Sequence, residues 1–465
     1  MEDKILQGQF QIPGKEGEEC GGKVEFTPED GVLVKLFNIG DELFVDKTPD
    51  RVRQIVGMST DAEPIRLHQC SRKNISSTSG SLGRAKTKTY HAQSMFVGYP
   101  FINNNPAFDD LEVYQPLLAD WADLSGPVTN LSDVTFPASK PGDILRVEYT
   151  QPDLPSVRIN GIEIEIATKP TTNMGQVDLG QISVEVFWRI TPRKNQVPFS
   201  QYMRTVQNLQ DLLSFALAQP VGIWKLIGNV DIPYESKDVE ISYQPSPNIK
   251  QSDGERAHNV LFRLDDVHSS FEEILKTWFE KSEVLTPVFH LYFATQDNSA
   301  MYVQNKLLNL TQALETYHRR SVGGTYLSEQ EYEDVYQDLI TFLNGQLGQR
   351  YGLKNDFTTH LRKGTFRHAN EYSLGKRLGE LISEHEGTLR ELHWNLIGKE
   401  RAVVDTRNYL THYDEKGKAV LGKEQIHLVW GLQQLVEVCL LAEMGIPENH
   451  VVEQMSDRYR DREIK

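Results

Sequence analysis

The sequence predicts an α+β multidomain protein, with a β-rich N-terminal domain followed by an all-α helical bundle. Three observations support this fold class. Short β-branched runs of period two fill the first half, helical apolar stripes fill the second half, and a polar, proline-containing segment separates them. At 465 residues the chain is long enough for two or three domains. We place the domains at residues 1–295 and 296–465.

The N-terminal domain is predicted from its strands and from two helical inserts. Strands that largely alternate apolar and polar side chains are expected at residues 31–37, 157–166 and 182–190. Asn160-Gly161 is expected to form the type I′ turn of a hairpin. Helices are expected at 112–122 and 199–218, a mobile loop in the Ser/Gly/Lys-rich stretch 71–88, and a connector at 245–256.

The C-terminal half is predicted to be a bundle of five helices with mostly short links. They are expected at residues 301–320, 328–342, 373–386, 396–410 and 423–444, after an opening helix at 268–281. Residues 285–293 form either a strand or the start of a helix. Ser328 and Glu331 are typical of a capping box, and Gly345 or Gly348 is expected to end that helix. The charged tail from Met455 is expected to fray.

Composition restricts the classes of function. The net charge is −16, so the surface repels nucleic acid non-specifically and an RNA site needs a local basic pocket. The chain from about residue 300 onward carries roughly −3 of this excess. Three widely spaced cysteines, Cys20, Cys70 and Cys439, argue against a disulfide framework and favour a reducing cytoplasm. The sequence shows no transmembrane run and no signal peptide.

The candidate site is the segment Arg407-Asn408-Tyr409-Leu410-Thr411-His412 in the fourth predicted helix of the bundle. A guanidinium binds phosphate through two parallel hydrogen bonds, and an imidazole can move the proton of a ribose hydroxyl. On a straight helix His412 lies about 7.5 Å along the axis from Arg407 and roughly 140° around it. The two side chains can meet at one phosphate only if the helix ends between them or if a second copy completes the site.

The spacing of Arg407 and His412 recurs in this chain, so context has to distinguish it. Only Arg407 is followed by Asn, lies in a helix-rich region and has a long apolar helix just downstream. The alternative interpretation is a cationic pair that stabilises a helix C-terminus. Asn408 either orients the phosphate or the imidazole, or bonds locally as a cap. Three other pairs fit the spacing: Arg84–His91, Arg263–His268 and Arg362–His368.

The Arg-Asn-x3-His arrangement resembles the HEPN ribonuclease signature, in which Arg, a polar residue and then His follow one another at this spacing. The segment from Leu307 to Arg320, with Gly323-Gly324 just beyond it, and the segment from Arg407 to Tyr413 resemble the Apea-like HEPN group of bacterial proteins. The first half resembles the N-terminal domain that accompanies that group. The resemblance implies anti-phage defence by abortive infection, in which a toxic ribonuclease halts the infected cell.

The resemblance also implies a mechanism and partners. Arg407, His412 and Asn408 are the implied catalytic residues, and attack by a 2′-OH leaves a 2′,3′-cyclic phosphate without a metal. Glu315, Arg319 and Tyr413 are candidate substrate-binding residues. The implied partners are RNA, with tRNA as one candidate, a second copy of the chain through the C-terminal bundle, and a phage-derived trigger at the N-terminal domain. No cofactor, metal or membrane is expected. The alternative is a non-catalytic HEPN-type module that binds nucleic acid or protein.

Two further groups of residues have both a functional and a structural interpretation. A basic stretch either guides an RNA backbone or is a solvated face; it consists of Arg362, Lys363, Arg367, His368, Lys376 and Arg377. Three aromatic residues of the first half either stack on bases or pack in the core; they are Phe187, Trp188 and Trp224.

Overall fold

The computed structural model describes twelve stretches of the chain. They are residues 1–12, 19–39, 50–80, 83–100, 105–124, 152–173, 181–193, 196–243, 260–297, 300–392, 396–413 and 416–460. The chain divides into two compact units, Met1–Phe279 and Glu280–Lys465, which we describe separately. The first is rich in strands and the second is helical, so the predicted fold class is confirmed. The division falls inside one helix, α4 (Phe271–Asp297), and the predicted boundary lies near the end of that helix.

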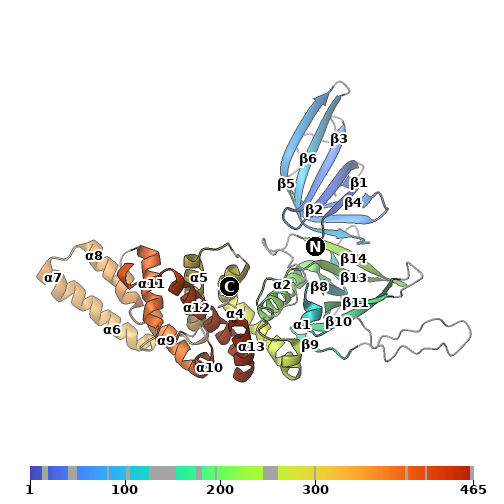
Figure 1. Cartoon of the computed structure of the whole chain (residues 1–465). Coiled ribbons are helices and arrows are strands. Elements are labelled where there is room, and N and C mark those ends of the chain that lie inside the picture. Colours follow the sequence, from blue (N-terminus) through green and yellow to red (C-terminus); the bar gives the residue numbers. More distant parts are fainter. Residues whose placement is uncertain are drawn as a thin grey trace, which may run out of the picture. The chain divides into compact units, whose positions relative to one another are not determined.

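Six antiparallel strands of the first unit close into a barrel (Figure 1). They are β1 (Lys4–Gln11), β2 (Cys20–Thr27), β3 (Gly31–Ile39), β4 (Arg51–Ser59), β5 (Pro64–Gly80) and β6 (Gly83–Val97). The strand order is β3-β2-β1-β4-β5-β6, and β3 also pairs with β6. In β2, Val24 and Phe26 are buried while Lys23 and Glu25 alternate with them toward solvent. This alternation places one face of each strand in the barrel core.

A second group of strands continues from the barrel, because β6 also pairs with β14. The order continues as β14 (Glu235–Tyr243), β13 (Lys225–Ile232), β8 (Asp110–Tyr114), β11 (Gln181–Pro192), β10 (Ile162–Asn173) and β9 (Ser156–Ile159). A separate small pair joins β7 (Ala107–Phe108) to β12 (Val197–Pro198). Asn160 and Gly161 link β9 to β10 with φ of 49° and 84°, as a type I′ turn requires, so that prediction is confirmed.

Helices of the first unit are α1 (Leu118–Trp121), α2 (Phe199–Ala216), α3 (Leu264–Val267) and the first part of α4. Helix α2, predicted at 199–218, is confirmed. Its Tyr202 hydroxyl donates to the Phe108 carbonyl at 3.0 Å, and Trp278 Nε1 donates to the Asn208 carbonyl at 2.9 Å. Phe187 and Trp188 are fully buried, and Trp188 donates to Gln115, so these two rings belong to the core.

Two predictions for the first unit are wrong. The stretch 71–88 is not a loop, because β5 and β6 pair through it, with Arg72 opposite Tyr90. Residues 73–76 are exposed, so these strands need no apolar face there, which explains their loop-like composition. The predicted helix 112–122 is helical only at α1; its first three residues belong to the strand β8, which lies between β11 and β13 and is buried on both faces. Burial on both faces removes the alternation that identifies a strand. The connector predicted at 245–256 lies outside the described residues.

The second unit contains the end of α4 and nine further helices in its described part. They are α5 (Val303–Ser321), α6 (Glu329–Phe342), α7 (Gly348–Tyr351), α8 (Asn355–His360), α9 (Leu374–Glu384), α10 (Glu386–Glu391), α11 (Glu400–His412), α12 (Lys423–Glu443) and α13 (Glu448–Arg460). Helices α5, α9, α11 and α12 pack against one another and form the bundle core. Their buried side chains include Leu307, Leu314, Leu378, Leu381, Val403, Leu410, Leu432 and Leu435.

Helix α12 is the centre of this core. Among the described residues it is the one helix that is long and apolar enough to cross a membrane, but 78% of its most apolar window is buried within the protein. Such burial is typical of a core helix. Gly445 follows it with φ of 76°, which confirms the predicted end.

Three predictions for the second unit need correction. Residues 285–293 lie in the middle of α4, which continues through Pro287. Neither Gly345 nor Gly348 ends α6; a π-helical segment, Leu343–Leu347, joins α6 to α7, and Gly352 ends that run with φ of 59°. Residues 455–460 belong to α13, where Met455 is buried; 461–465 lie outside the described residues. The capping box of Ser328 and Glu331 is confirmed.

Candidate functional site

Helix α11 carries both residues of the predicted motif. It runs without interruption from Glu400 to His412 and ends at Tyr413, which has the left-handed φ of 58° and donates its N–H to the Tyr409 carbonyl. The helix therefore does not end between Arg407 and His412. Regular helix geometry places their side chains roughly 140° apart. Of the two arrangements that the sequence left open for a shared phosphate, a helix end between the two residues is therefore excluded, and completion by a second copy stays a prediction.

The core face of α11 fixes the rotation of the helix. Val403, Thr406 and Leu410 are buried at successive turns of the helix. Thr406 Oγ1 donates to the Ala402 carbonyl at 2.7 Å and accepts the N–H of Val420 at 2.9 Å. The Thr406 hydroxyl thus links α11 by a hydrogen bond to Val420, in the segment that precedes α12. This packing leaves Arg407 half-buried and His412 exposed.

The surroundings of Arg407 leave its charge available. Arg407 Nη1 donates to Asn408 Oδ1 at 3.2 Å, and the Thr411 hydroxyl donates to the Arg407 carbonyl at 2.8 Å. In the described part of the chain, no carboxylate pairs with Arg407 or His412. Arg401 on the same helix differs, because its Nε contacts Asp405 at 3.0 Å. Arg407 is thus a cation oriented by a neutral amide, an arrangement suited to binding an anion.

Tyr413, one of the predicted substrate-binding residues, lies directly beside His412. Its side chain is 71% exposed, and its ring meets the ring of Tyr409 edge-on at 5.5 Å. An exposed aromatic ring next to the imidazole offers a surface on which a base can stack. Its role in binding stays a prediction.

The other two predicted binding residues are engaged with each other. Arg319 on α5 forms ion pairs with Glu315, at 3.0 Å, and with Glu371. Glu371 also accepts a hydrogen bond from His368. The contact with His368, and after it the contact with Arg319, holds the pKa of the Glu371 carboxyl below its ordinary value. No hydrogen bond or ion pair of the described residues joins this cluster to Arg407. With two carboxylates beside it, Arg319 has little charge left for an RNA phosphate, although its role stays a prediction.

A buried polar clamp joins α5 to α9, and the sequence did not indicate it. Arg377 is only 2% exposed and donates to His318 Nδ1 at 3.0 Å, to the Gly323 carbonyl at 2.6 Å and to the Gly324 carbonyl at 3.2 Å. Because a guanidinium only donates, His318 Nδ1 is the acceptor. The His318 Nε2 therefore carries the proton and donates to Glu380 at 2.8 Å.

The clamp corrects part of the predicted basic stretch. Arg377 is buried and fully engaged, so it is not a guide for an RNA backbone. Its neighbour Lys376 lies over the rings of Tyr372 and Tyr326, at 3.5 and 4.4 Å from their centres. Gly323 and Gly324, whose carbonyls accept from Arg377, have φ of 95° and 105°, a backbone conformation that favours glycine.

The other Arg–His pairs of similar spacing have different settings. Arg263 precedes α3 and donates to the Asp120 carbonyl at 2.9 Å, while His268 lies in the 3₁₀ turn that follows α3. Arg362 lies in a π-helical segment, and His368 contacts Glu371. Neither pair lies on one regular α-helix as Arg407 and His412 do. Arg84 lies among residues whose side chains are not described.

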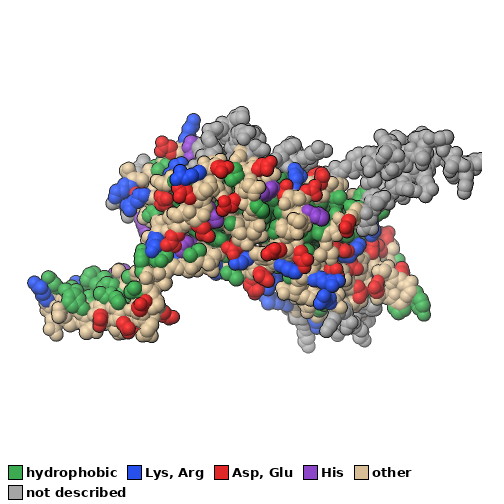
Figure 2. All heavy atoms as spheres, turned by 90° about the horizontal axis from the view of Figure 1, so that it is seen from below, with side chains coloured by type: hydrophobic (Ala, Val, Ile, Leu, Met, Phe, Trp, Pro, Cys, Tyr) green, Lys and Arg blue, Asp and Glu red, His purple; other side chains and the backbone are tan. Residues whose placement is uncertain are grey.

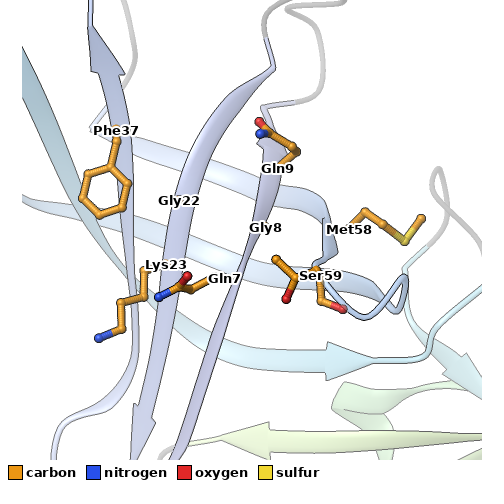
Figure 3. A pocket seen from close by; sticks show the side chains of 9 residues that line it. Gln7, Gly8, Gln9, Gly22, Lys23, Phe37, Met58 and Ser59 are labelled. Atoms are coloured by element: carbon orange, nitrogen blue, oxygen red, sulfur yellow. The ribbon is translucent and has the colours of Figure 1, made fainter.

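The N-terminal barrel carries a hollow of about 520 Å³ on its outer surface (Figure 3). Glycines of β1 and β2 are among the residues that line it, and Phe37 and Met58, which also line it, are 44% and 48% exposed. A Cβ on Gly8 would lie 2.0 Å from the Met58 carbonyl oxygen, so this close strand approach requires glycine. The lining residues are Gln7, Gly8, Gln9, Gly22, Lys23, Phe37, Met58, Ser59 and Thr60.

No group of three or more potential metal ligands occurs among the residues that the structure describes.

The sequence was compared with models of known protein families. A family model described as ApeA N-terminal domain 1 matches residues 6–278, and one described as Apea-like HEPN matches residues 308–450. The second match contains α5, α9, α11 and α12, and with them Arg407 and His412. Searches of curated proteins and of solved structures found no match.

Proposed function

Because the chain belongs to the Apea-like HEPN proteins that carry an ApeA N-terminal domain, which makes it a HEPN-type anti-phage defence protein, we propose that it is a metal-independent endoribonuclease. The observation that carries this proposal is the location of Arg407 and His412 and the absence of a carboxylate partner for either side chain in the described part of the chain. Both lie on one uninterrupted helix, both reach the surface, and neither pairs with a carboxylate in the described part of the chain. Cleavage of cellular RNA then stops the infected cell.

In the proposed reaction Arg407 holds the scissile phosphate and neutralises the charge that builds up in the transition state. The ribose 2′-oxygen forms a bond to phosphorus while the bond from phosphorus to the 5′-oxygen breaks. One His412 imidazole takes the proton of the 2′-OH, or an imidazolium gives a proton to the leaving 5′-oxygen. The products are a 2′,3′-cyclic phosphate and a 5′-OH end. Asn408 positions the guanidinium through its 3.2 Å contact.

The site takes Arg407 from one copy of the chain and His412 from another. The supporting argument is their divergence of roughly 140° around a helix that does not end between them. A two-fold axis beside α11 would bring both pairs to one cleft. In this scheme the N-terminal unit receives the trigger, and the hollow that contains Phe37 and Met58 is a candidate surface for that role.

The test is a cleavage assay with purified full-length protein and cellular RNA in the presence of EDTA. Parental protein should leave 2′,3′-cyclic ends, whereas Arg407→Ala and His412→Ala should leave the RNA intact. Arg401→Ala, on the same helix, and His290→Ala, an exposed histidine of α4, are matched controls that should cut normally.

Two results would contradict the proposal. If the Arg407→Ala and His412→Ala proteins cut at the parental rate, the site is elsewhere. If the parental protein binds RNA without cutting it, and if growth on induction does not depend on His412, the chain is instead a non-catalytic binding module.

A further inference from the structure

One helical hairpin of the second unit lies outside the bundle core. This arm, residues 329–368, contains α6, α7 and α8 with their π-helical joints (Figure 1). Its two legs are joined by hydroxyl groups: Tyr332 donates to the Phe366 carbonyl, and Tyr336 donates to the Arg362 carbonyl at 3.3 Å. At its base, Asn370 and Leu327 exchange two hydrogen bonds of 2.8 and 2.9 Å. The arm is thus a built element with a fixed base.

The arm exposes apolar side chains that have no cover in a single copy. Every residue of the arm is described, and among its thirteen aliphatic and aromatic side chains only Leu343 is buried. Two helices in contact cannot bury both of their faces, so such a hairpin normally packs against a further layer. Figure 2 shows hydrophobic side chains gathered along the arm at the left of the view. The most exposed are Val335, Phe342, Phe357 and Tyr351, at 42%, 46%, 49% and 63%.

The two legs of the arm carry opposite charges. The outgoing leg, residues 329–351, has five acidic residues and one basic residue, whereas the return leg, residues 353–368, has four basic residues and one acidic residue. None of these charged groups forms an ion pair within the arm. Each leg therefore presents an unneutralised charge beside the shared apolar surface. The basic residues of the return leg are Lys354, Arg362, Lys363 and Arg367.

We propose that the arm is a docking surface for the same arm of a second copy of this chain. In a two-fold arrangement the acidic leg of each copy faces the basic leg of the other, because such an interface repeats every contact twice. Residues 329–351 span roughly 34 Å, and two helices side by side are about 20 Å wide, so one face offers about 700 Å². A standard interface buries about 800 Å² from each partner.

An RNA partner fits the arm less well, because α6 places five carboxylates next to the basic leg and would repel a phosphate backbone. The inference deepens the proposed function and rests on it in one respect, the need for a second copy at Arg407 and His412. Association itself is measured without RNA, so the two proposals can fail separately.

The test uses light scattering and sedimentation of the full chain at low salt. Asp334→Lys with Asp338→Lys sets two lysines against the basic leg of the partner copy, and Arg362→Glu with Lys363→Glu sets two glutamates against its acidic leg. Each double variant should self-associate at least about tenfold more weakly than the parental protein, because every reversed charge occurs twice in the interface. Mixing the two variants should restore a dimer, now a heterodimer.

Controls separate this outcome from misfolding. Glu453→Lys on α13 reverses an exposed charge outside the arm and should leave association unchanged, and helical content by circular dichroism should match in all variants. A parental protein that is strictly monomeric at high concentration overturns the inference. So does a dimer that neither double variant weakens, or a pair of variants that lose RNA binding while their association is intact. A parental dimer that the double variants weaken, but that does not cut RNA, supports the inference and counts against the proposed function instead.

Discussion

Replacing Asn408 by Asp tests whether Arg407 must be free of negative charge. Asn and Asp have nearly the same shape and similar helix propensity, so α11 should be preserved. The change puts a carboxylate oxygen about 3.2 Å from Arg407 Nη1, where the amide oxygen now lies. At that separation two unit charges attract by about 1.3 kcal/mol in water and about 5 kcal/mol at an effective dielectric constant of 20.

Solvent exposure of the site favours the lower figure, and exposed ion pairs contribute at most about 1 kcal/mol. A phosphate about 6 Å from the new carboxylate adds roughly 0.7 kcal/mol of repulsion in water. The total is at most about 1.7 kcal/mol, or roughly a 15-fold loss of cleavage efficiency, since 1.4 kcal/mol corresponds to tenfold. Asn408→Ala removes one exposed hydrogen bond and should cost about 0.5–1 kcal/mol, a two- to fivefold loss.

The assay is single-turnover cleavage of a labelled RNA by parental, Asn408→Asp and Asn408→Ala proteins. The salt dependence of binding adds a second measurement, because a neutralised Arg407 releases fewer counterions from the RNA and lowers the slope. Equal losses in the two variants, or an Asn408→Asp protein as active as the parental one, would refute the argument that Arg407 acts as an unpaired cation.

Further predictions concern catalysis, sharing of the site and stability. His412→Ala should lower the cleavage rate by about 10² to 10⁴ at unchanged thermal stability, as measured by calorimetry alongside the assay. When Arg407→Ala and His412→Ala proteins exchange subunits, about a quarter of the sites should regain activity, whereas no recovery would argue against a site shared in trans. His268→Ala and His368→Ala should cut RNA normally, and a loss in either folded variant would contradict the assignment. Arg377→Ala should lower the free energy of unfolding by about 2–4 kcal/mol in a denaturant titration, because buried acceptors lose their donor; a loss below 1 kcal/mol would contradict the clamp.

Local patterns in the sequence predicted much of the helical unit. Helices α5, α9 and α12 lie close to their expected bounds because apolar stripes and caps are local signals. Helix α11 was placed a few residues early at both ends. It ends at Tyr413, a residue type that seldom adopts positive φ, so no glycine marks the end.

Features that depend on residues far apart in the chain left no such signal. The clamp joins His318 to Arg377, and nothing near either residue distinguishes a buried, fully bonded arginine from a solvated one. The β5–β6 hairpin and β8 were misassigned for opposite reasons. The exposed part of the β5–β6 hairpin has no apolar face, whereas β8 is apolar on both faces. The candidate motif itself was predictable, because its residues lie within six positions on one helix.

Closure of the N-terminal barrel determines how that unit can recognise another molecule. Each of its six strands has a neighbour on both sides, since β3 pairs with β6 as well as with β2. Along β3, whose described residues pair on both sides, the backbone N–H and C=O groups are already engaged, and an incoming peptide finds no free edge to extend. Recognition along β3 is left to side chains such as that of Phe37. A molecule that binds there is selected by its surface chemistry and not by its readiness to form a strand.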